Sequence, residues 1–280
     1  MFQTVAKPKR RSALRLALGA WWYRMRRYGR WAASSRAFAR TMRSEPLSYV
    51  AFEHRTPLYR KLKDVDMWLQ HNKVVNLSLA LPRLNGIVVM PGETFSYWRL
   101  IGKPTKRKGY VPGMVLSSGS FRAGIGGGLC QLSNLIYWMA LHTPLQVTER
   151  HRHSYDVFPD VSRTQPFGSG ATCYYNYIDL QIRNPTSEPY QLKVWMEDGY
   201  LCGEWRSASR RGVRYRVYEK EHRIRMEPWG GYTRSNSIWR QTMDEAGTVL
   251  HDEWITDNHA IMMYEPMLTE GKTEAGTNGK

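Results

Sequence analysis

The stretch Gly124-Ile-Gly-Gly-Gly-Leu-Cys130-Gln131-Leu-Ser133 is the part of the sequence that says most about the fold. Its four glycines in five residues let the backbone turn sharply and approach other groups closely. Apolar residues then recur at the spacing of one helical face, at Leu132, Leu135, Ile136, Met139 and Ala140. We therefore expect a tight turn followed by a buried amphipathic helix that begins beside Cys130.

Cys130 is the first candidate for chemistry, because it is expected at a helix N-terminus. Unpaired backbone N–H groups and the helix dipole favour negative charge there, and the thiolate is the nucleophilic form of cysteine. A glycine-rich loop before a helix is also typical of phosphate binding, but the P-loop lysine and Ser/Thr are missing. The simpler alternative is a small, inert cysteine packed under the turn. Both interpretations of the thiol stay open.

Composition indicates a folded protein of one large or two modest domains. The chain has 280 residues, 42% of them hydrophobic and 12% aromatic. No run approaches the ~20 apolar residues that span a bilayer. The three cysteines, Cys130, Cys173 and Cys202, lack metal-ligand spacing such as C-x-x-C. A Cys173–Cys202 disulfide is one alternative, but two buried thiols are favoured because both lie in strand-like segments.

A basic arm precedes the rest of the chain. The net charge is +17, and residues 1–43 carry twelve Lys or Arg and no Asp or Glu. Residues 12–43 contain a helical pattern whose apolar face is formed by Leu14, Leu18, Trp21, Met25 and Tyr28. The remainder of that helix carries Arg15, Arg24, Arg26, Arg27 and Arg30. This pattern is typical of a helix at an anionic membrane surface.

Two other roles for the arm remain open, namely nucleic-acid binding and docking of its apolar face onto the main domain. No recognised nucleic-acid-binding motif accompanies the arm, so no specific nucleic acid is expected as a partner. The apolar stretch after Arg10-Arg11 is interrupted by Arg15 and stopped by Arg24, which is too short and too charged for a signal peptide. We therefore expect a cytoplasmic protein, peripherally bound to the membrane through residues 12–43.

The remaining pattern predicts an α+β fold, with N-terminal helices, the cysteine helix on an antiparallel sheet, and a β-rich C-terminal section. Helices are expected from Thr56-Pro57 onward and over residues 74–85. Strands are expected over 87–90, as a pair within 110–123, over 147–155, as a hairpin over 189–206, and across 213–264. The corresponding domain boundaries are 1–45 for the arm, 46–206, 207–266, and a polar tail at 267–280.

Several motifs in a fixed order resemble the VanW family. They are Pro91–Ser96, Gly124–Gln131, Glu149–Ser154, Pro166–Cys173, Tyr177–Leu180, Gly230–Arg234 and Asn258–Glu265, and they cover most of residues 46–266. The resemblance implies a link to the bacterial cell wall and to vancomycin resistance. Related domains are thought to be L,D-transpeptidases of peptidoglycan that use the cysteine of the glycine-rich motif.

The resemblance also implies a set of site residues. Cys130 matches the family's nucleophile. His153 matches the histidine of the H-x-H-S segment that recurs more regularly in the family, and Asp179 matches the family's strand aspartate. Many members carry an aspartate where this chain has Gly170, before Ala171-Thr172-Cys173, which places activity in question. From spacing alone, His151 and His153 would share one face of a strand, and only one of them can reach the cysteine.

Acyl transfer by a thiolate needs a base and backbone donors for the tetrahedral oxyanion. We assign the donors to the loop Gly126, Gly127, Gly128 and Leu129 with the first helical amides. Gln131, beside the nucleophile, either orients substrate or donates to the oxyanion, and the alternative is a residue at the helix start that faces solvent. Zinc bound by Cys130, His151 and His153 is disfavoured by their scattered spacing, so no metal or cofactor is expected.

Two functions follow from the sequence. One is a cysteine-dependent acyl transferase, L,D-transpeptidase-like, acting on peptidoglycan peptides or precursors. The other is a non-catalytic module that binds cell-wall precursors or a partner protein at the membrane.

Overall fold

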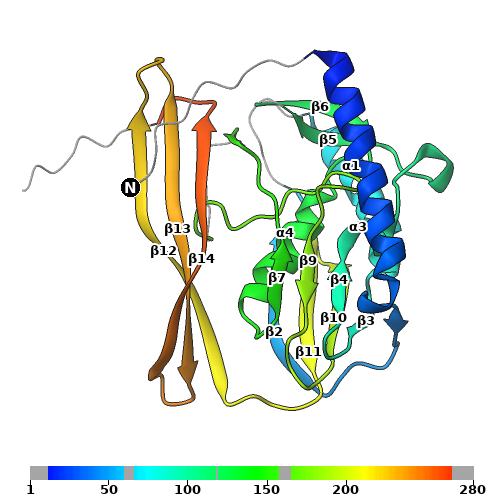
Figure 1. Cartoon of the computed structure of the whole chain (residues 1–280), viewed down its shortest axis with the longest axis vertical. Helices are drawn as coiled ribbons and strands as arrows, with labels where there is room; N and C mark the ends of the chain where they lie inside the picture. Colours follow the sequence, from blue (N-terminus) through cyan, green and yellow to red (C-terminus); the bar gives the residue numbers. More distant parts are fainter. Residues whose placement is uncertain (1–11, 60–65, 118, 158–164, 267–280) are drawn as a thin grey trace, which may run out of the picture.

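The computed structural model describes residues 12–59, 66–117, 119–157 and 165–266, and it has the predicted α+β architecture (Figure 1). The α-helices are α1 Ala13–Ala33, α2 Met67–Ala80, α3 Tyr97–Ile101 and α4 Cys130–Leu141. Short 3-10 turns are η1 Ser35–Ala37, η2 Leu81–Arg83 and η3 Lys106–Lys108. The predicted segments 1–11 and 267–280 lie outside the described residues.

Antiparallel pairing dominates the sheets. The first sheet has the order β1-β3-β10-β11-β2, with bounds Thr41–Met42, Ile87–Val89, Tyr190–Glu197, Tyr200–Ser207 and Tyr49–Pro57. The second is β4-β9-β7, with bounds Thr94–Ser96, Gln181–Arg183 and Gln146–Glu149. β5 Pro112–Ser117 and β6 Ser120–Ile125 form a hairpin, as the pattern within 110–123 predicts. The last sheet is β12-β13-β14-β8, with bounds Val213–Met226, Tyr232–Asp244, Val249–Met262 and Tyr155–Asp156, where β8 is parallel to β14.

The cysteine helix α4 forms the centre of the core. Its residues from Leu135 to Leu141 are all buried, and it packs across β11 and β2. Gly203 on β11 makes this close approach possible, since a Cβ there would lie 2.8 Å from Met139 and 3.2 Å from Leu135. The buried residues of the core cluster run from Trp31 to Trp205, and Val217 of β12 and Ile255 of β14 pack against it as partly buried side chains.

Helix α1 lies along the outside of this core (Figure 1). Its N-cap is Ser12, whose hydroxyl accepts a hydrogen bond from Arg15 N at 3.4 Å. Only Arg27 and Trp31 of α1 are buried, while the predicted apolar face, from Leu14 to Tyr28, is exposed. The helix therefore docks through its C-terminal half. Of the predicted apolar face, Tyr28 contacts the main domain there, through a hydrogen bond of 2.9 Å between its hydroxyl and that of Tyr175.

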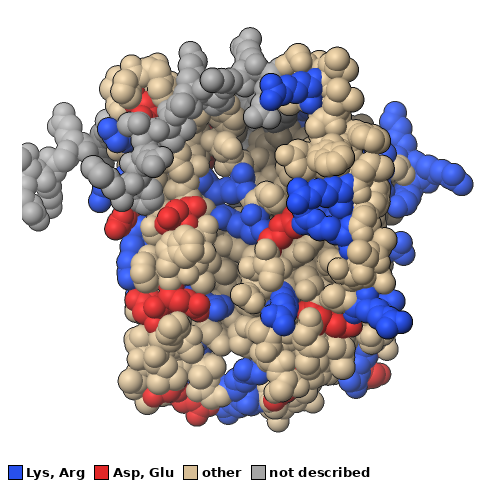
Figure 2. Space-filling view, viewed as in Figure 1, with Lys and Arg blue, Asp and Glu red and all other residues tan. Residues whose placement is uncertain are grey.

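The long β12-β13-β14 sheet stands beside the core, and Figure 2 shows a hollow between it and the part that carries α1. Its contacts with the core include polar ones. Asn236 donates to the carbonyl of Phe167 at 2.8 Å, and Arg240 donates to the carbonyl of Thr143 at 2.8 Å. The sheet thus meets the core through hydrogen bonds as well as through the apolar side chains of Val217 and Ile255.

The helix predicted from Thr56-Pro57 is wrong. Residues 49–57 form β2, which pairs with β11 from Tyr49↔Ser207 to Pro57↔Tyr200. Pro57 is the last residue of this edge strand, where a missing N–H costs little. The helix that follows is α2, so the helix predicted over 74–85 begins earlier, at Met67, and ends at Ala80 before η2. Residues 60–65 lie outside the described part of the chain.

The strand predicted over 147–155 is also shorter than expected. β7 ends at Glu149 and β8 begins only at Tyr155, so His151 and His153 lie in the connecting segment. In that segment the carbonyl of His151 accepts from Thr172 N at 2.8 Å, and Arg150 is hydrogen-bonded to the carbonyls of Gly168 and Gly170. These crossing contacts replace strand pairing, so the two histidines do not share a strand face.

Candidate functional site

The glycine loop before α4 is packed against two other segments. A Cβ on Gly127 would lie 2.1 Å from the backbone of Gly113, and one on Gly128 would lie 2.3 Å from the side chain of Lys73. Gly128 also has a φ of +91°, which an L side chain rarely adopts. These positions need glycine for close approach, and they fix the point at which α4 begins.

The backbone donors of the loop are mostly occupied. Gly126 N donates to Val111 O, Gly127 N to Gly124 O, and Gly128 N to Met114 O at 2.9 Å. In the described part of the chain, the N–H groups of Leu129 and Cys130 have no hydrogen-bond acceptor. Of the donors predicted for an oxyanion, the structure thus leaves Leu129 and the first helical amide uncommitted.

Cys130 lies at the predicted place, as the first residue of α4. Its half-buried Sγ donates to the carbonyl of Cys173 at 3.6 Å. Burial raises the pKa of the Cys130 thiol, although the backbone contacts at Cys173 and Cys130 oppose this shift. Burial therefore outweighs the groups that favour the thiolate, and the net shift of this pKa is upward.

A second thiol and a phenol share the surroundings of Cys130. Cys173 is buried and unpaired, as is Cys202, so the two favoured buried thiols are confirmed and the disulfide is absent. The Tyr97 hydroxyl donates to Leu129 O at 2.9 Å. Burial, and then the neighbouring Cys173 and Cys130, raise the pKa of Tyr97 well above its usual range. Beside the start of α4, the two thiols and the phenol therefore favour their neutral forms.

Asp179 is fully buried in the loop just before β9. It accepts hydrogen bonds from Ser96 Oγ at 2.6 Å, Trp98 N at 2.9 Å, Leu180 N at 3.0 Å and Gln181 Nε2 at 3.2 Å. Burial raises the pKa of Asp179 to about 6, in spite of the opposing hydrogen bonds from Ser96 and Trp98. Its contacts hold the start of α3 against the β4-β9-β7 sheet.

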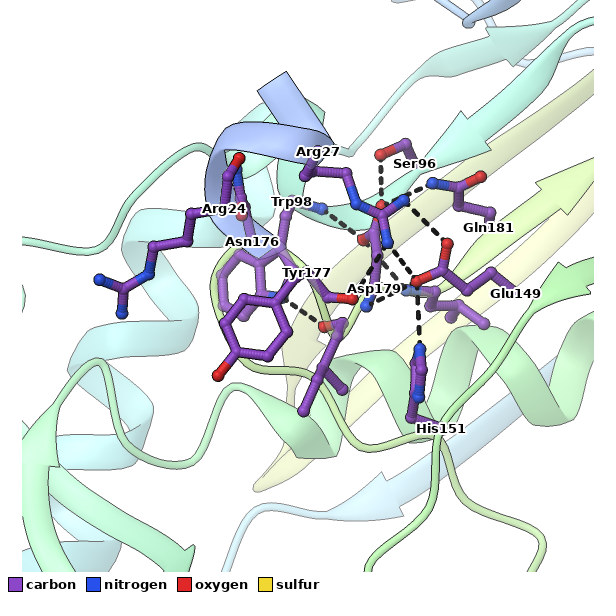
Figure 3. Close-up of polar contacts among 12 residues, drawn as sticks. Arg24, Arg27, Ser96, Trp98, Glu149, His151, Asn176, Tyr177, Asp179 and Gln181 are labelled. Atoms are coloured by element: carbon purple, nitrogen blue, oxygen red, sulfur yellow. Dashed lines mark hydrogen bonds and ion pairs between the residues drawn. The ribbon is translucent and has the colours of Figure 1, made fainter. Parts of the chain in front are cut away.

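A second carboxylate, Glu149, lies beside Asp179 and ties α1 to the site (Figure 3). Glu149 Oε1 accepts from Arg27 at 2.5 Å, from His151 Nε2 at 3.1 Å and from Asp179 N at 3.3 Å. Arg27 also donates to Tyr177 O at 3.0 Å. Burial alone would raise the pKa of Glu149, but hydrogen bonds from His151 and Arg27 hold it below its usual range. We call Arg27, Glu149, His151 and Asp179 the carboxylate cluster.

Two other predicted site residues, His153 and Gln131, make no hydrogen bond to the Cys130 thiol within the described residues. His153 is half-buried, and burial followed by the charge of Arg152 lowers its pKa. No hydrogen bond or ion pair joins His153 to Cys130 in the described part of the chain. The Gln131 amide donates to Thr56 Oγ1 at 3.0 Å and to Pro57 O at 2.8 Å, so it anchors α4 to β2.

At Gly170, where many family members carry an aspartate, the structure leaves little room for a side chain. A Cβ on Gly170 would lie 2.9 Å from Asn134 Oδ1, and the same oxygen accepts from Ala171 N at 2.7 Å. Ser133 Oγ donates to Ala171 O at 2.7 Å. Side chains of α4 thus hold the 171–173 segment beside Cys130 and fill the space that an aspartate would take.

Two site residues were missed from the sequence. Arg27 was placed on the solvated basic face of α1, yet it is buried against Glu149. Cys173 is predicted as a buried thiol or a disulfide partner, but not as a neighbour of Cys130. The signal for Arg27 is a helical one, since it lies four residues before the buried Trp31 and so shares its face.

The described residues contain no group of three or more His, Cys, Asp or Glu arranged to hold a metal ion. Among the helices of those residues, none is long and apolar enough to cross a membrane.

Comparison with known proteins agrees with the family resemblance of the sequence motifs. A family model described as "VanW like protein" matches residues 72–206. The chain is 40% identical over 167 residues to vancomycin B-type resistance protein VanW of Enterococcus faecalis (strain ATCC 700802 / V583), covering 60% of this chain and 61% of that protein. It is 31% identical over 119 residues to the uncharacterized protein YoaR of Bacillus subtilis (strain 168), covering 42% and 38%. The chain thus spans less than two thirds of each of these relatives, and no solved structure matches.

Proposed function

Because this chain belongs to the VanW family, we propose that it acts in cell-wall chemistry linked to vancomycin resistance, as a cysteine-dependent acyl transferase on peptidoglycan peptides or their precursors. The observation that supports this most is the start of α4. There a half-buried thiol stands beside two backbone N–H groups, of Leu129 and Cys130, that have no acceptor within the described residues. Such donors stabilise the oxyanion of acyl transfer.

The proposed reaction proceeds through a thioester. The Cys130 thiol gives its proton to a histidine, and the sulfur attacks a stem-peptide carbonyl to form a tetrahedral oxyanion. The oxyanion collapses as the C–N bond breaks, and the leaving amine takes the proton. A second amine then attacks the thioester and restores the thiol. Because burial raises the pKa of Cys130, this scheme needs proton transfer at the moment of attack and not a resting thiolate.

The proposed base is His153, from the family resemblance, and His151 is the competing choice. Glu149 orients His151 by a hydrogen bond to its Nε2, as a carboxylate does for a catalytic imidazole. His151→Gln and His153→Gln variants separate the two. The base is the residue whose loss removes the acidic limb of the rate profile, whereas the other variant keeps that profile.

The catalytic proposal is tested with the full chain and stem peptides, with mass spectrometry of the protein. We expect an acyl adduct on Cys130 that disappears in Cys130→Ala. Cys202→Ser is the matched control, since Cys202 lies on β11 outside the contacts of the site. If the adduct persists without Cys130, or if no peptide is ever exchanged, the acyl-transfer proposal fails.

A second function is a non-catalytic module that binds a cell-wall precursor. The raised pKa of Cys130 and the occupied donors of Gly126–Gly128 favour it. The same variants decide between the two. If Cys130→Ala binds the precursor and supports resistance as well as the unmodified chain does, the protein is a binding module and not an acyl transferase.

We also propose that α1 holds the protein on the cytoplasmic surface of the membrane. Trp21 and Trp22 are 59% and 60% exposed, and Leu14 is 70% exposed, while Arg27 and Trp31 fix the other end of the helix. Figure 2 shows more Lys and Arg than Asp and Glu on the half of the molecule that carries α1. Exposed tryptophans with flanking arginines suit an anionic lipid surface.

Vesicle sedimentation tests this surface. A Trp21→Ser/Trp22→Ser variant should lose most binding to phosphatidylglycerol vesicles, and binding of the unmodified chain should fall as salt rises. Trp254→Ser is the control, because Trp254 is also exposed, at 54%, but lies on β14. Equal sedimentation of the two variants contradicts the proposal. Protease protection in intact cells tests the compartment separately.

A further inference from the structure

An open pocket lies on the core at the end of the segment that follows α1. Its volume is about 310 Å³, and it is lined by Ala39, Arg40, Met42, Pro82, Arg83, Arg99 and Leu100. The arginines come from three separate parts of the chain, namely the segment before β1, the turn η2 and helix α3. No Asp or Glu is among these lining residues.

Two of the three guanidinium groups, those of Arg40 and Arg83, are exposed and make no hydrogen bond or ion pair within the described residues. Arg99 is fixed by a hydrogen bond to Trp31 O at 3.0 Å and lies 5.0 Å from the ring of Phe38. The pocket therefore has one anchored arginine and two whose donors are uncommitted.

The positive charges in this pocket repel one another. Burial, and then the charge of Arg40, lower the pKa of Arg99, and no carboxylate of the lining offsets this repulsion. Guanidinium groups match phosphate oxygens by paired, charge-assisted hydrogen bonds. A bound polyanion would thus supply both the missing acceptors and the missing negative charge.

We propose that this pocket binds a phosphate or diphosphate group. Arg99 of α3, which is already held in place, positions the anion, and the guanidinium groups of Arg40 and Arg83 donate further hydrogen bonds to it. The group is carried either by a soluble compound or by a lipid headgroup, and the chemistry of recognition is the same. The pocket is separate from the Cys130 site, so this inference does not depend on acyl transfer.

Isothermal titration of the full chain with inorganic diphosphate, at constant ionic strength, tests the site. We expect saturable binding that weakens at least tenfold in Arg40→Gln/Arg83→Gln. Among the residues that the structure describes, these two side chains have no hydrogen-bond or ion-pair partner to lose, so the variant should fold with an unchanged or higher Tm. Arg36→Gln is the matched control, an exposed arginine of η1 outside the pocket, and should bind as the unmodified chain does.

Vesicles distinguish the source of the anion. Vesicles of phosphatidylcholine with phosphatidic acid present a phosphomonoester, and the same vesicles with phosphatidylglycerol provide a control for surface charge. A lipid ligand predicts that the double variant loses only the phosphatidic acid preference. A soluble ligand predicts loss of diphosphate binding with no change on vesicles. Absence of saturable diphosphate binding together with no phosphatidic acid preference, or equal binding by the double variant, overturns the site.

Discussion

Asp179 is the residue whose ionisation should most affect stability. Burial places its pKa at about 6, above the ordinary ~3.9, so between those values the folded protein holds a proton that the unfolded chain has released. The free energy of unfolding therefore falls as pH rises through this window. Complete ionisation costs on the order of 3 kcal/mol, and about half of that cost appears between pH 5 and 7.5.

Asp179→Asn should remove this slope. Its Oδ1 can keep the bonds from Trp98 N and Leu180 N, while the amide adjusts to Ser96 and Gln181. Urea unfolding between pH 5 and 7.5 measures the effect and avoids the opposite contribution of Glu149 at lower pH. Asp179→Ala is the contrasting variant, expected to lose about 2–4 kcal/mol at every pH because Trp98 N is left unpaired. A pH slope that persists in Asp179→Asn would assign the titration to another group.

Gly128 tests whether the loop depends on close packing. Gly128→Ala should cost about 2–4 kcal/mol, because the new Cβ meets the Lys73 side chain and the backbone has a positive φ. Gly92→Ala is the matched control, with a φ of +78° and no atom within 4 Å of the new Cβ. It should cost only about 1 kcal/mol. Equal losses in chemical denaturation would show that backbone strain alone accounts for Gly128.

At the scale of elements, the buried ion pair of Arg27 with Glu149 helps to attach α1 to the core, beside the buried side chain of Trp31. Arg27→Met leaves Glu149 without its strongest partner and should cost about 3–5 kcal/mol, whereas Arg26→Gln, exposed next to it, should cost less than 0.5 kcal/mol. The double variant Arg27→Met/Glu149→Gln should lose clearly less than the sum of the single losses. Additive losses in thermal denaturation would mean that the two side chains do not act as a pair.

The elements that the sequence predicted well are those whose cause is local. The turn before Cys130 follows from its glycines, α4 from its apolar spacing, and the β5-β6 hairpin and β12–β14 from short-range alternation and turn residues. β2 was missed because Thr56-Pro57 has a local helix signal, which pairing with β11, about 150 residues further along, overrides.

The candidate site was less predictable than the fold, for the same physical reason. Cys130 and Asp179 were recognised from motifs, but their pKa directions depend on burial, which the surrounding fold supplies. The charge of Arg27 predicts a solvent-exposed side chain, and it is buried because Glu149, distant in the sequence, lies opposite and pairs with it. The placement of His151 and His153 depended on how long β7 would continue, and Arg150 ends the strand by bonding across to the 168–170 loop.

For the whole molecule, we expect the core to fold without the C-terminal sheet. The buried cluster ends at Trp205, and the contacts of that sheet with the core include hydrogen bonds such as Arg150 to Asn258 and Arg240 to Thr143. A chain ended after Ser207 should unfold cooperatively, with a Tm lowered by several degrees. Near-ultraviolet circular dichroism and thermal scans measure this. Loss of cooperative unfolding would make β12–β14 part of the core.

Because α1 and β2 pair with partners far along the sequence, they cannot reach their native contacts until much of the chain has been synthesised. Arg27 emerges 122 residues ahead of Glu149, and β2 emerges well before β11 can close the first sheet. During that interval Trp31 of α1, which the folded core buries, and an unpaired strand edge have no native surface to cover them. Slow translation would lengthen this exposure. Nascent chains stalled before β11 should therefore bind holdase chaperones or lipid strongly, and release them once residue 207 has left the exit tunnel.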